Sequence, residues 1–326
     1  MKKLLSGLFV LALTLSTTSN IFAQHKINEI EIQKDMVLDG GTLLPHETFT
    51  FTMTPAQVED NTVLDYLEVK PGLDLNEFNT ITISYNENEE ELSKKAAFNL
   101  SHLTFDKEAA IYRYEIKEIS NQNDAITYDN TSYIVDVYVT NNGDIEYVIP
   151  KDASASSKTP IIFTNTYETE TLEISKTVEG IFADENKDFN FKLTLDECST
   201  LPAQTLLQAT KTLNDGTLEP ITFTVGIENN FTLKHNENIS IHNLPQGMTY
   251  HISEDEAIGY TSEMTDSDNG VMSDDGATVH FVNTKVETVE TGIMLNTAPY
   301  LVSIGAFFIG LALIVVVKKN KAEDEC

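Results

Sequence analysis

The chain has 326 residues, of which 41% are hydrophobic, so it is long enough to form one or two ordinary cores. Its formal net charge is −30, because 51 acidic side chains face only 21 lysines and arginines. This charge makes nucleic acid and anionic lipid surfaces poor partners.

Both ends of the chain are predicted to be targeting segments. Two lysines and an apolar run precede Ala23, which is typical of a secretory signal peptide over residues 1–23. Residues 298–317 are uncharged and mostly apolar, close to the ~20 residues that a membrane-spanning helix needs. A lysine-rich tail follows and predicts a cytoplasmic C-terminus. We therefore expect an exported protein whose precursor is held in the membrane by its tail.

The chain contains two cysteines, Cys198 and Cys326. Cys326 follows the predicted membrane helix and is expected on the cytoplasmic side. The exported part therefore has one thiol and cannot form an internal disulfide. Any covalent reinforcement of this part must come from another kind of bond.

The sequence between the two ends is predicted to be all-β. Short runs alternate apolar and polar residues, and turn signals such as NDG (214–216) and LPQG (244–247) separate them. Examples of these runs are FTFTM (49–53), YIVDVYVT (133–140), FNFKLTL (189–195) and TVHFVNT (278–284). Many short strands at this spacing predict β-sandwiches.

The predicted strands repeat themselves in two halves. ETFTFTM, YRYEIKE and PIIFTNT in the first half are echoed by KDFNFKLTL, TYHISED and VHFVNTK in the second. We therefore predict two tandem domains, over residues 24–166 and 167–286. Residues 287–326 form the C-terminal region that contains the membrane helix.

Each half places one lysine, one glutamate and one asparagine among the inward-facing residues of three strands. The two sets are Lys34, Glu118 and Asn165, and Lys176, Glu254 and Asn283. Burial lowers the pKa of an amine and raises that of a carboxyl group, so the proton can pass from lysine to glutamate. The neutral amine is then a nucleophile that can attack the asparagine carboxamide and expel ammonia. The alternative is a buried Lys–Glu ion pair capped by asparagine, without a covalent bond.

Two short sequence motifs that contain the glutamates and the asparagines occur twice. They are the Tyr-x-Ile-x-Glu box, YEIKE (114–118) and YHISE (250–254), and the Phe-x-Asn-Thr strand, FTNT (163–166) and FVNT (281–284). With these motifs the chain resembles the two-domain backbone pilins of Gram-positive bacteria, of the streptococcal T-antigen type. The resemblance implies immunoglobulin-like (CnaB-like) β-sandwich domains with self-formed Lys–Asn isopeptide bonds. Lys34 would then bond to Asn165 with Glu118 as the catalytic acid, and Lys176 to Asn283 with Glu254.

The resemblance also implies how subunits are joined. TVETG (288–292) stands where such pilins carry a sorting signal, so a pilus sortase would cleave the bond between Thr291 and Gly292. The motif lacks the proline of the common Leu-Pro-x-Thr-Gly signal, which leaves the class of sortase open. Lys158 occupies the place of the linking lysine, and Lys151 is its nearest competitor. Thr291 of one subunit would bond to Lys158 of the next.

The predicted function is therefore that of a backbone subunit in a covalent, cell-wall-anchored surface pilus with a role in adhesion and colonisation. Its expected partners are copies of itself, a pilus sortase, minor pilins and peptidoglycan. The alternative is a wall-anchored monomeric adhesin that binds a host ligand and needs no linking lysine. We expect no cofactor, no metal and no enzymatic activity beyond single-turnover crosslinking. The acidic stretch 266–276 lacks the residue spacing of a calcium loop.

Overall fold

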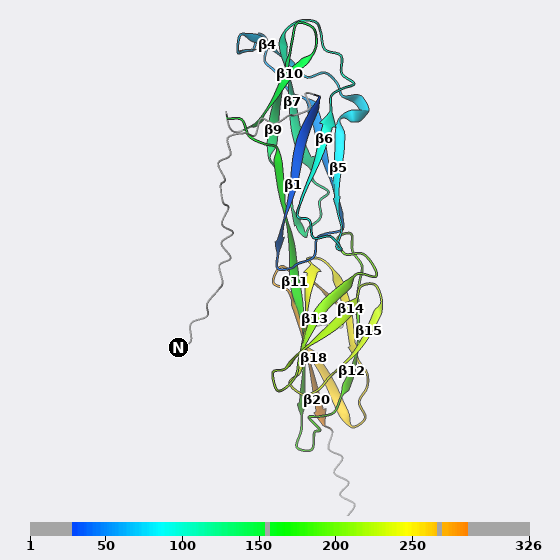
Figure 1. The fold of residues 1–326 in the computed structure, drawn as a ribbon. Coiled ribbons are helices and arrows are strands. Elements are labelled where there is room, and N and C mark those ends of the chain that lie inside the picture. Colours follow the sequence, from blue (N-terminus) through cyan, green and yellow to red (C-terminus); the bar gives the residue numbers. More distant parts are fainter. Residues whose placement is uncertain (1–27, 154–156, 266–268, 286–326) are drawn as a thin grey trace, which may run out of the picture.

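The computed structural model describes residues 28–153, 157–265 and 269–285, which form two β-sandwiches joined end to end (Figure 1). Apart from the short 3-10 turn η1 (Asn76–Phe78), the regular elements of this part are strands. The prediction of an all-β, two-domain protein is confirmed. No helix within the described ranges has the length and apolar character to cross a membrane. The signal peptide 1–23, the sorting motif 288–292 and the predicted helix 298–317 lie outside these ranges.

The first domain consists of two facing sheets. In one, β1 lies between β6 and the first half of β11, and β8 pairs with β11; the other has the order β10-β9-β7-β2-β5, with β4 beside β7. The strands are β1 (Glu29–Asp39), β2 (Glu47–Pro55), β3 (Val63–Leu64), β4 (Leu67–Pro71), β5 (Thr80–Tyr85), β6 (Ser93–Asn99), β7 (Ala110–Ile119), β8 (Ile126–Thr127), β9 (Ser132–Val139), β10 (Ile145–Asp152) and β11 (Ile162–Glu179).

The second domain repeats this plan. One sheet contains β14, β13, β16, the second half of β11, β20 and β18, and the other has the order β15-β12-β17-β19. The remaining strands are β12 (Phe189–Leu195), β13 (Leu206–Thr212), β14 (Leu218–Thr224), β15 (Glu228–Leu233), β16 (Asn238–Pro245), β17 (Thr249–Glu254), β18 (Tyr260–Thr265), β19 (Asn269–Val271) and β20 (Ala277–Lys285).

Each domain has its own hydrophobic core between its sheets. Successive side chains of a strand point to opposite faces, and in β1 burial alternates with this period of two. The same aromatic contact recurs in both cores: the ring centroids of Phe51 and Phe163 are 5.0 Å apart, as are those of Phe191 and Phe281. The echo in the sequence therefore corresponds to a repeat of core packing.

Strand β11 belongs to both domains, and Figure 1 shows it running from one into the other. It is parallel to β1 in the first domain and to β20 in the second, with the same register of inward-facing residues. The cross-strand pairs are Lys34 with Phe163 and Met36 with Asn165, then Lys176 with Phe281 and Val178 with Asn283. In each domain the lysine and asparagine are thus offset by two residues on neighbouring strands and face the same core.

The loop after β1 attaches the first domain to the second. Asn243 accepts hydrogen bonds from the backbone N–H groups of Thr42 and Leu43 through its side-chain oxygen. Gly40, with φ of +79°, lies against β11, and a Cβ atom there would stand 1.8 Å from the carbonyl oxygen of Thr169. Only glycine fits this approach without displacing the backbone.

We predict that Gly40→Ala lowers the melting temperature of the two-domain protein by several degrees more than Gly216→Ala. Both positions have positive φ, and this conformation costs a residue with Cβ about 1–2 kcal/mol. Gly216 has no atom within 4 Å of the added Cβ, so it reports the cost of the conformation alone. Calorimetry of the two variants measures the difference, and equal shifts would contradict the contact at Thr169.

Candidate functional site

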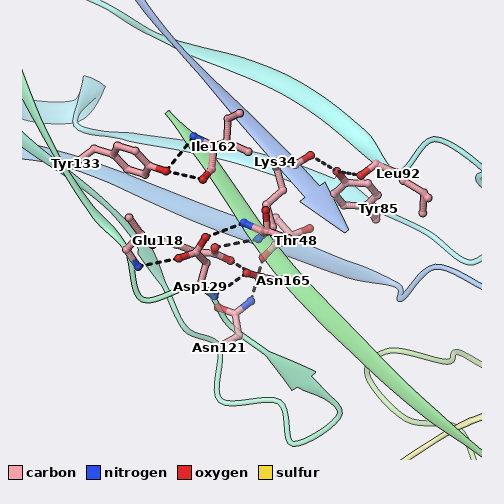
Figure 2. A network of polar contacts seen from close by, with 12 residues as sticks. Lys34, Thr48, Tyr85, Leu92, Glu118, Asn121, Asp129, Tyr133, Ile162 and Asn165 are labelled. Carbon is pink, nitrogen blue, oxygen red and sulfur yellow. Dashed lines mark hydrogen bonds and ion pairs between the residues drawn. The ribbon is translucent and has the colours of Figure 1, made fainter. Parts of the chain in front are cut away.

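Lys34, Glu118 and Asn165 meet in the core of the first domain (Figure 2). Lys34 on β1 and Asn165 on β11 are neighbours in one sheet, and Glu118 reaches them from β7 in the facing sheet. One carboxylate oxygen of Glu118 is 2.9 Å from Lys34 Nζ, and the other accepts a hydrogen bond of 2.6 Å from Asn165 Nδ2. The side chains of Lys34 and Glu118 are 0% exposed, as is the whole of Asn165. Glu118 therefore bridges an amine and a carboxamide away from water.

Burial works against both charges of this pair. Burial lowers the pKa of Lys34 to about 8, although the attraction of Glu118 opposes the shift. Burial also raises the pKa of Glu118, against the opposing effects of Lys34 and Asn165. The transfer of a proton from the ammonium to the carboxylate is therefore easier here than in water, and it produces a nucleophilic amine.

An aromatic ring from the facing sheet completes the enclosure. Lys34 Nζ lies 4.6 Å from the ring centroid of Phe49 on β2. Phe51, two residues further along the same strand, contacts Phe163, which precedes Asn165 by two residues. The Phe49 ring shields the amine from water and contributes to its desolvation.

The second domain contains the same arrangement. Lys176 Nζ is 3.1 Å from each carboxylate oxygen of Glu254 on β17, and Asn283 Nδ2 donates a short hydrogen bond to Oε1. Burial lowers the pKa of Lys176 to about 8, against the attraction of Glu254. The ring centroid of Phe189 lies 4.5 Å from Lys176 Nζ. The side chains of Lys176 and Glu254 are 0% and 3% exposed.

The two sites differ in the groups around them. In the first, the backbone N–H of Asp129 donates a hydrogen bond of 2.8 Å to Asn165 Oδ1. In the second, Asn283 Oδ1 is buried and has no hydrogen-bond partner among the residues that the structure describes. There, instead, the hydroxyl of Ser262 donates to Glu254 Oε2 over 2.7 Å.

The two candidate linking lysines have different surroundings. Lys158 is exposed, and its backbone forms an isolated antiparallel β-bridge with that of Lys151. Lys151 Nζ is 2.9 Å from Oδ2 of Asp136, a fully buried carboxylate that also forms two hydrogen bonds with Arg113. Burial alone would raise the pKa of Asp136, but the hydrogen bonds from Arg113 and Lys151 hold it below its ordinary value. Lys151 is thus committed to a buried ion pair. Thr291 and Gly292 lie outside the described residues.

Several contributing residues were not predicted from the sequence. Phe49 and Phe189 lie in the repeated FTF and FNF segments, so the repetition could have predicted that both rings lie near the lysines. Asp129 follows β8 and Ser262 lies in β18, which pair with equivalent residues of β11 and β20. Neither side chain is repeated in the other half, so no sequence pattern marked them. Within the described part of the chain, no group of three or more metal-ligating side chains could hold an ion.

Comparisons with known proteins relate the two halves to different models. The family model described as a Spy0128-like isopeptide containing domain matches residues 30–168, and a domain of unknown function (DUF7601) matches residues 170–285. A pilin of Streptococcus pyogenes serotype M1 is 30% identical over 339 aligned residues, covering 95% of this chain and 96% of that protein. A pilus tip adhesin of Streptococcus pyogenes is 34% identical over 135 residues, covering 38% of this chain and 18% of the adhesin.

Solved structures agree with these matches. The crystal structure of the major pilin from Streptococcus pyogenes is 28% identical, with a TM-score of 0.68, and covers 80% of this chain and 99% of that chain. The major pilin T-13 of the same species is 30% identical, with a TM-score of 0.64, and the match covers 80% of this chain and 97% of that one. The likeness therefore extends over both domains.

We predict that the unfolding free energy of an Asn165→Ala variant rises between pH 8 and pH 10.5. In this variant Lys34 has no carboxamide to react with, so its amine remains free to titrate. The folded pKa of Lys34 is about 8 and its ordinary value is 10.5, so the unfolded chain binds more protons in this window. The loss of stability that comes from burying the protonated Lys34 amine is complete below pH 8 and disappears above pH 10.5. Denaturant titrations at several pH values measure it.

The control for this prediction adds Lys34→Met and Glu118→Gln to the Asn165→Ala variant, which removes the titrating pair and keeps side chains of similar size. The difference in stability between the two proteins should change across the window. A constant difference would show that Lys34 has an ordinary pKa in the folded state.

Proposed function

This chain belongs to the family of the streptococcal major pilins and is a structural subunit of a cell-surface pilus backbone, and on that premise we propose how it is reinforced and joined. Two self-formed Lys–Asn isopeptide bonds reinforce each subunit, and a sortase links the subunits covalently. The observation that carries the first part is the matched pair of buried triads, in each of which one glutamate contacts both the lysine and the asparagine.

The bond in the first domain forms in a defined order of steps. Lys34 transfers a proton to Glu118, and the neutral amine attacks Cγ of Asn165. Glu118 then gives its proton to the departing Nδ2 and takes one from the attacking nitrogen. The bond between Cγ and Nδ2 breaks, ammonia leaves, and an amide joins the two side chains. One Nζ–Cγ bond replaces one Cγ–Nδ2 bond, so no oxidant or cofactor is required.

The fold supplies the acceleration that a weakly electrophilic carboxamide needs. The register of β1 and β11 fixes the lysine and asparagine side by side, and Glu118 is held between them. Well-oriented intramolecular reactions reach effective molarities of ~10⁵–10⁸ M. Lys176, Glu254 and Asn283 react in the same way in the second domain.

We propose the sortase-catalysed link between Thr291 and Lys158 of the next subunit for two reasons. Lys158 is exposed, whereas Lys151 is engaged by Asp136. In Figure 1, β10, which precedes Lys158, lies in the first domain, and β20 ends at the far end of the second. Thr291 follows the end of β20 by six residues, a reach of about 20 Å at 3.3–3.6 Å per extended residue. A contact between different surfaces of successive subunits propagates as a filament.

The remaining partners follow from this assembly. A pilus sortase carries out the linkage, minor pilins complete the fibre, and peptidoglycan anchors it. In this proposal the segment 298–317, predicted from the sequence to span the membrane, holds the precursor with its C-terminus in the cytoplasm until Thr291 is released from Gly292.

We predict that the mature ectodomain has a mass lower than its theoretical value by two molecules of ammonia. Glu118→Ala and Glu254→Ala should each restore the mass of one, because each removes the proton carrier of one bond. Intact-mass spectrometry measures this, and peptide mapping assigns each bond to its domain. Lys117→Ala, on the outward face beside Glu118, is the matched control and should leave both losses in place. The full theoretical mass in the unmodified protein would contradict both crosslinks.

We predict that Lys158→Arg abolishes the ladder of covalent polymers in cell-wall extracts, because a guanidinium cannot accept the acyl group. Lys151→Arg should leave the ladder intact, since arginine preserves the charge beside Asp136. Immunoblots of the two strains measure the outcome. A ladder that persists in Lys158→Arg and disappears in Lys151→Arg would contradict this assignment and identify Lys151 as the linking lysine. A monomer in the unmodified strain would support the adhesin alternative.

A further inference from the structure

The carbonyl oxygen of Asn165 has a dedicated hydrogen-bond donor. The backbone N–H of Asp129, in the loop between β8 and β9, points at Oδ1 from a distance of 2.8 Å (Figure 2). Asn165 is completely buried, so this contact is shielded from water. The carboxamide is thus hydrogen-bonded through its oxygen as well as through Nδ2, which donates to Glu118.

The side chain of Asp129 holds its own N–H in place. One carboxylate oxygen accepts a hydrogen bond of 2.8 Å from the backbone N–H of Thr131, which closes the turn. The other accepts one of 2.8 Å from the backbone N–H of Thr164, the residue before Asn165. The loop is therefore attached to the backbone of β11, which pairs with β8 two residues further along, next to the reacting asparagine. This attachment leaves little freedom for the Asp129 N–H to turn away from Oδ1.

The attack of Lys34 places negative charge on this oxygen. When Cγ of Asn165 becomes tetrahedral, the electrons of the carbonyl bond move to Oδ1. A backbone N–H at hydrogen-bond distance in a dry site stabilises such a charge without having to reorient, as the donors of an oxyanion hole do. The equivalent oxygen of Asn283 has no donor within the parts of the chain that the structure describes.

We propose that the Asp129 N–H is the oxyanion donor for the bond between Lys34 and Asn165, and that the Asp129 carboxylate positions it. The inference rests on the proposed crosslinking and goes beyond it, because it adds a catalytic group that has no equivalent among the described residues of the second domain. In the second domain, Ser262 instead holds the carboxylate of Glu254, so the two reactions are assisted at different atoms.

The charge of Asp129 has the opposite expected effect. A second carboxylate near the pair favours the protonated form of Lys34, and this attraction raises the pKa of the amine against the larger effect of burial. If the charge were its main influence, the loss of the carboxylate would accelerate the reaction. If Asp129 acts by positioning its N–H, the same change slows the reaction. The sign of the change in rate therefore separates the two roles.

The decisive experiment replaces the amide between Tyr128 and Asp129 by an ester, with an α-hydroxy acid analogue of aspartate at position 129. This change removes the N–H and keeps the carboxylate. The full chain is made by cell-free translation, and intact mass and peptide mapping follow each bond with time. We expect the bond between Lys34 and Asn165 to form about 100-fold more slowly, the lower end of the cost of one oxyanion-hole donor. The bond between Lys176 and Asn283 in the same molecule should form at its normal rate.

A second variant, Asp129→Asn, tests the positioning role. Its side chain can still accept from one backbone N–H but cannot hold both Thr131 and Thr164 through two acceptor oxygens. We expect a slowing of about 10-fold, confined to the first domain. To exclude loss of folding as the cause, the melting temperature of Asp129→Asn is compared in the Glu118→Ala background, where the first bond does not form. A shift of only a few degrees there, combined with the slower rate, supports positioning.

The possible failures are distinguishable. An ester variant that forms the first bond at the normal rate overturns the oxyanion role, as does an Asp129→Asn variant that reacts faster. Equal slowing of both bonds also overturns it, because the effect would not be local. The absence of the first bond in the unmodified chain would instead refute the crosslink on which the inference rests.

Discussion

The structure depends on the cost of keeping a lysine amine in an apolar core. Lys34 and Lys176 are almost completely buried against phenylalanine rings, where a charge is tolerated only if it is paired or neutralised. Pairing with glutamate satisfies this requirement temporarily. Under the proposed reaction, amide formation satisfies it permanently, because it converts both the amine and the carboxamide into one neutral group. In that reaction, the same desolvation that destabilises a charged lysine would promote the reinforcement of the fold.

Particular residues show how much of the fold and of the site could be predicted from the sequence. The period of two placed Lys34, Glu118 and Asn165 on inward faces, and the duplication in the second half separated this pattern from chance. The structure brings each set together across two sheets. The alternation of apolar and polar residues could not reveal that β11 continues through both domains. One long strand and two consecutive short strands give the same alternating pattern. Asp129 was also hidden, since its contact depends on a loop that returns to β11.

The two domains show how one plan accommodates different local chemistry. Register, aromatic contacts and the position of glutamate in the facing sheet are repeated, because they arise from strands that both halves share. Strands β8 and β18 also correspond, since they pair with β11 and β20 at equivalent positions, but their sequences differ. The turn after β8 provides Asp129, whereas β18 itself provides Ser262. Strand pairing therefore fixes the reacting groups, whereas the loops and edges adjust their surroundings.

The continuity of β11 has a mechanical consequence. In the proposed filament, tension enters a subunit at Lys158 and passes along β11 to Lys176. The crosslink then transmits it to Asn283 on β20, from which it leaves toward Thr291. Residues 177–282 lie outside this covalent path, so a pull cannot lengthen the chain by unravelling them. Because β11 and β20 are parallel, the pull acts along the strands and loads their hydrogen bonds together in shear. A thin fibre of such subunits would resist extension through bonds that do not need to break.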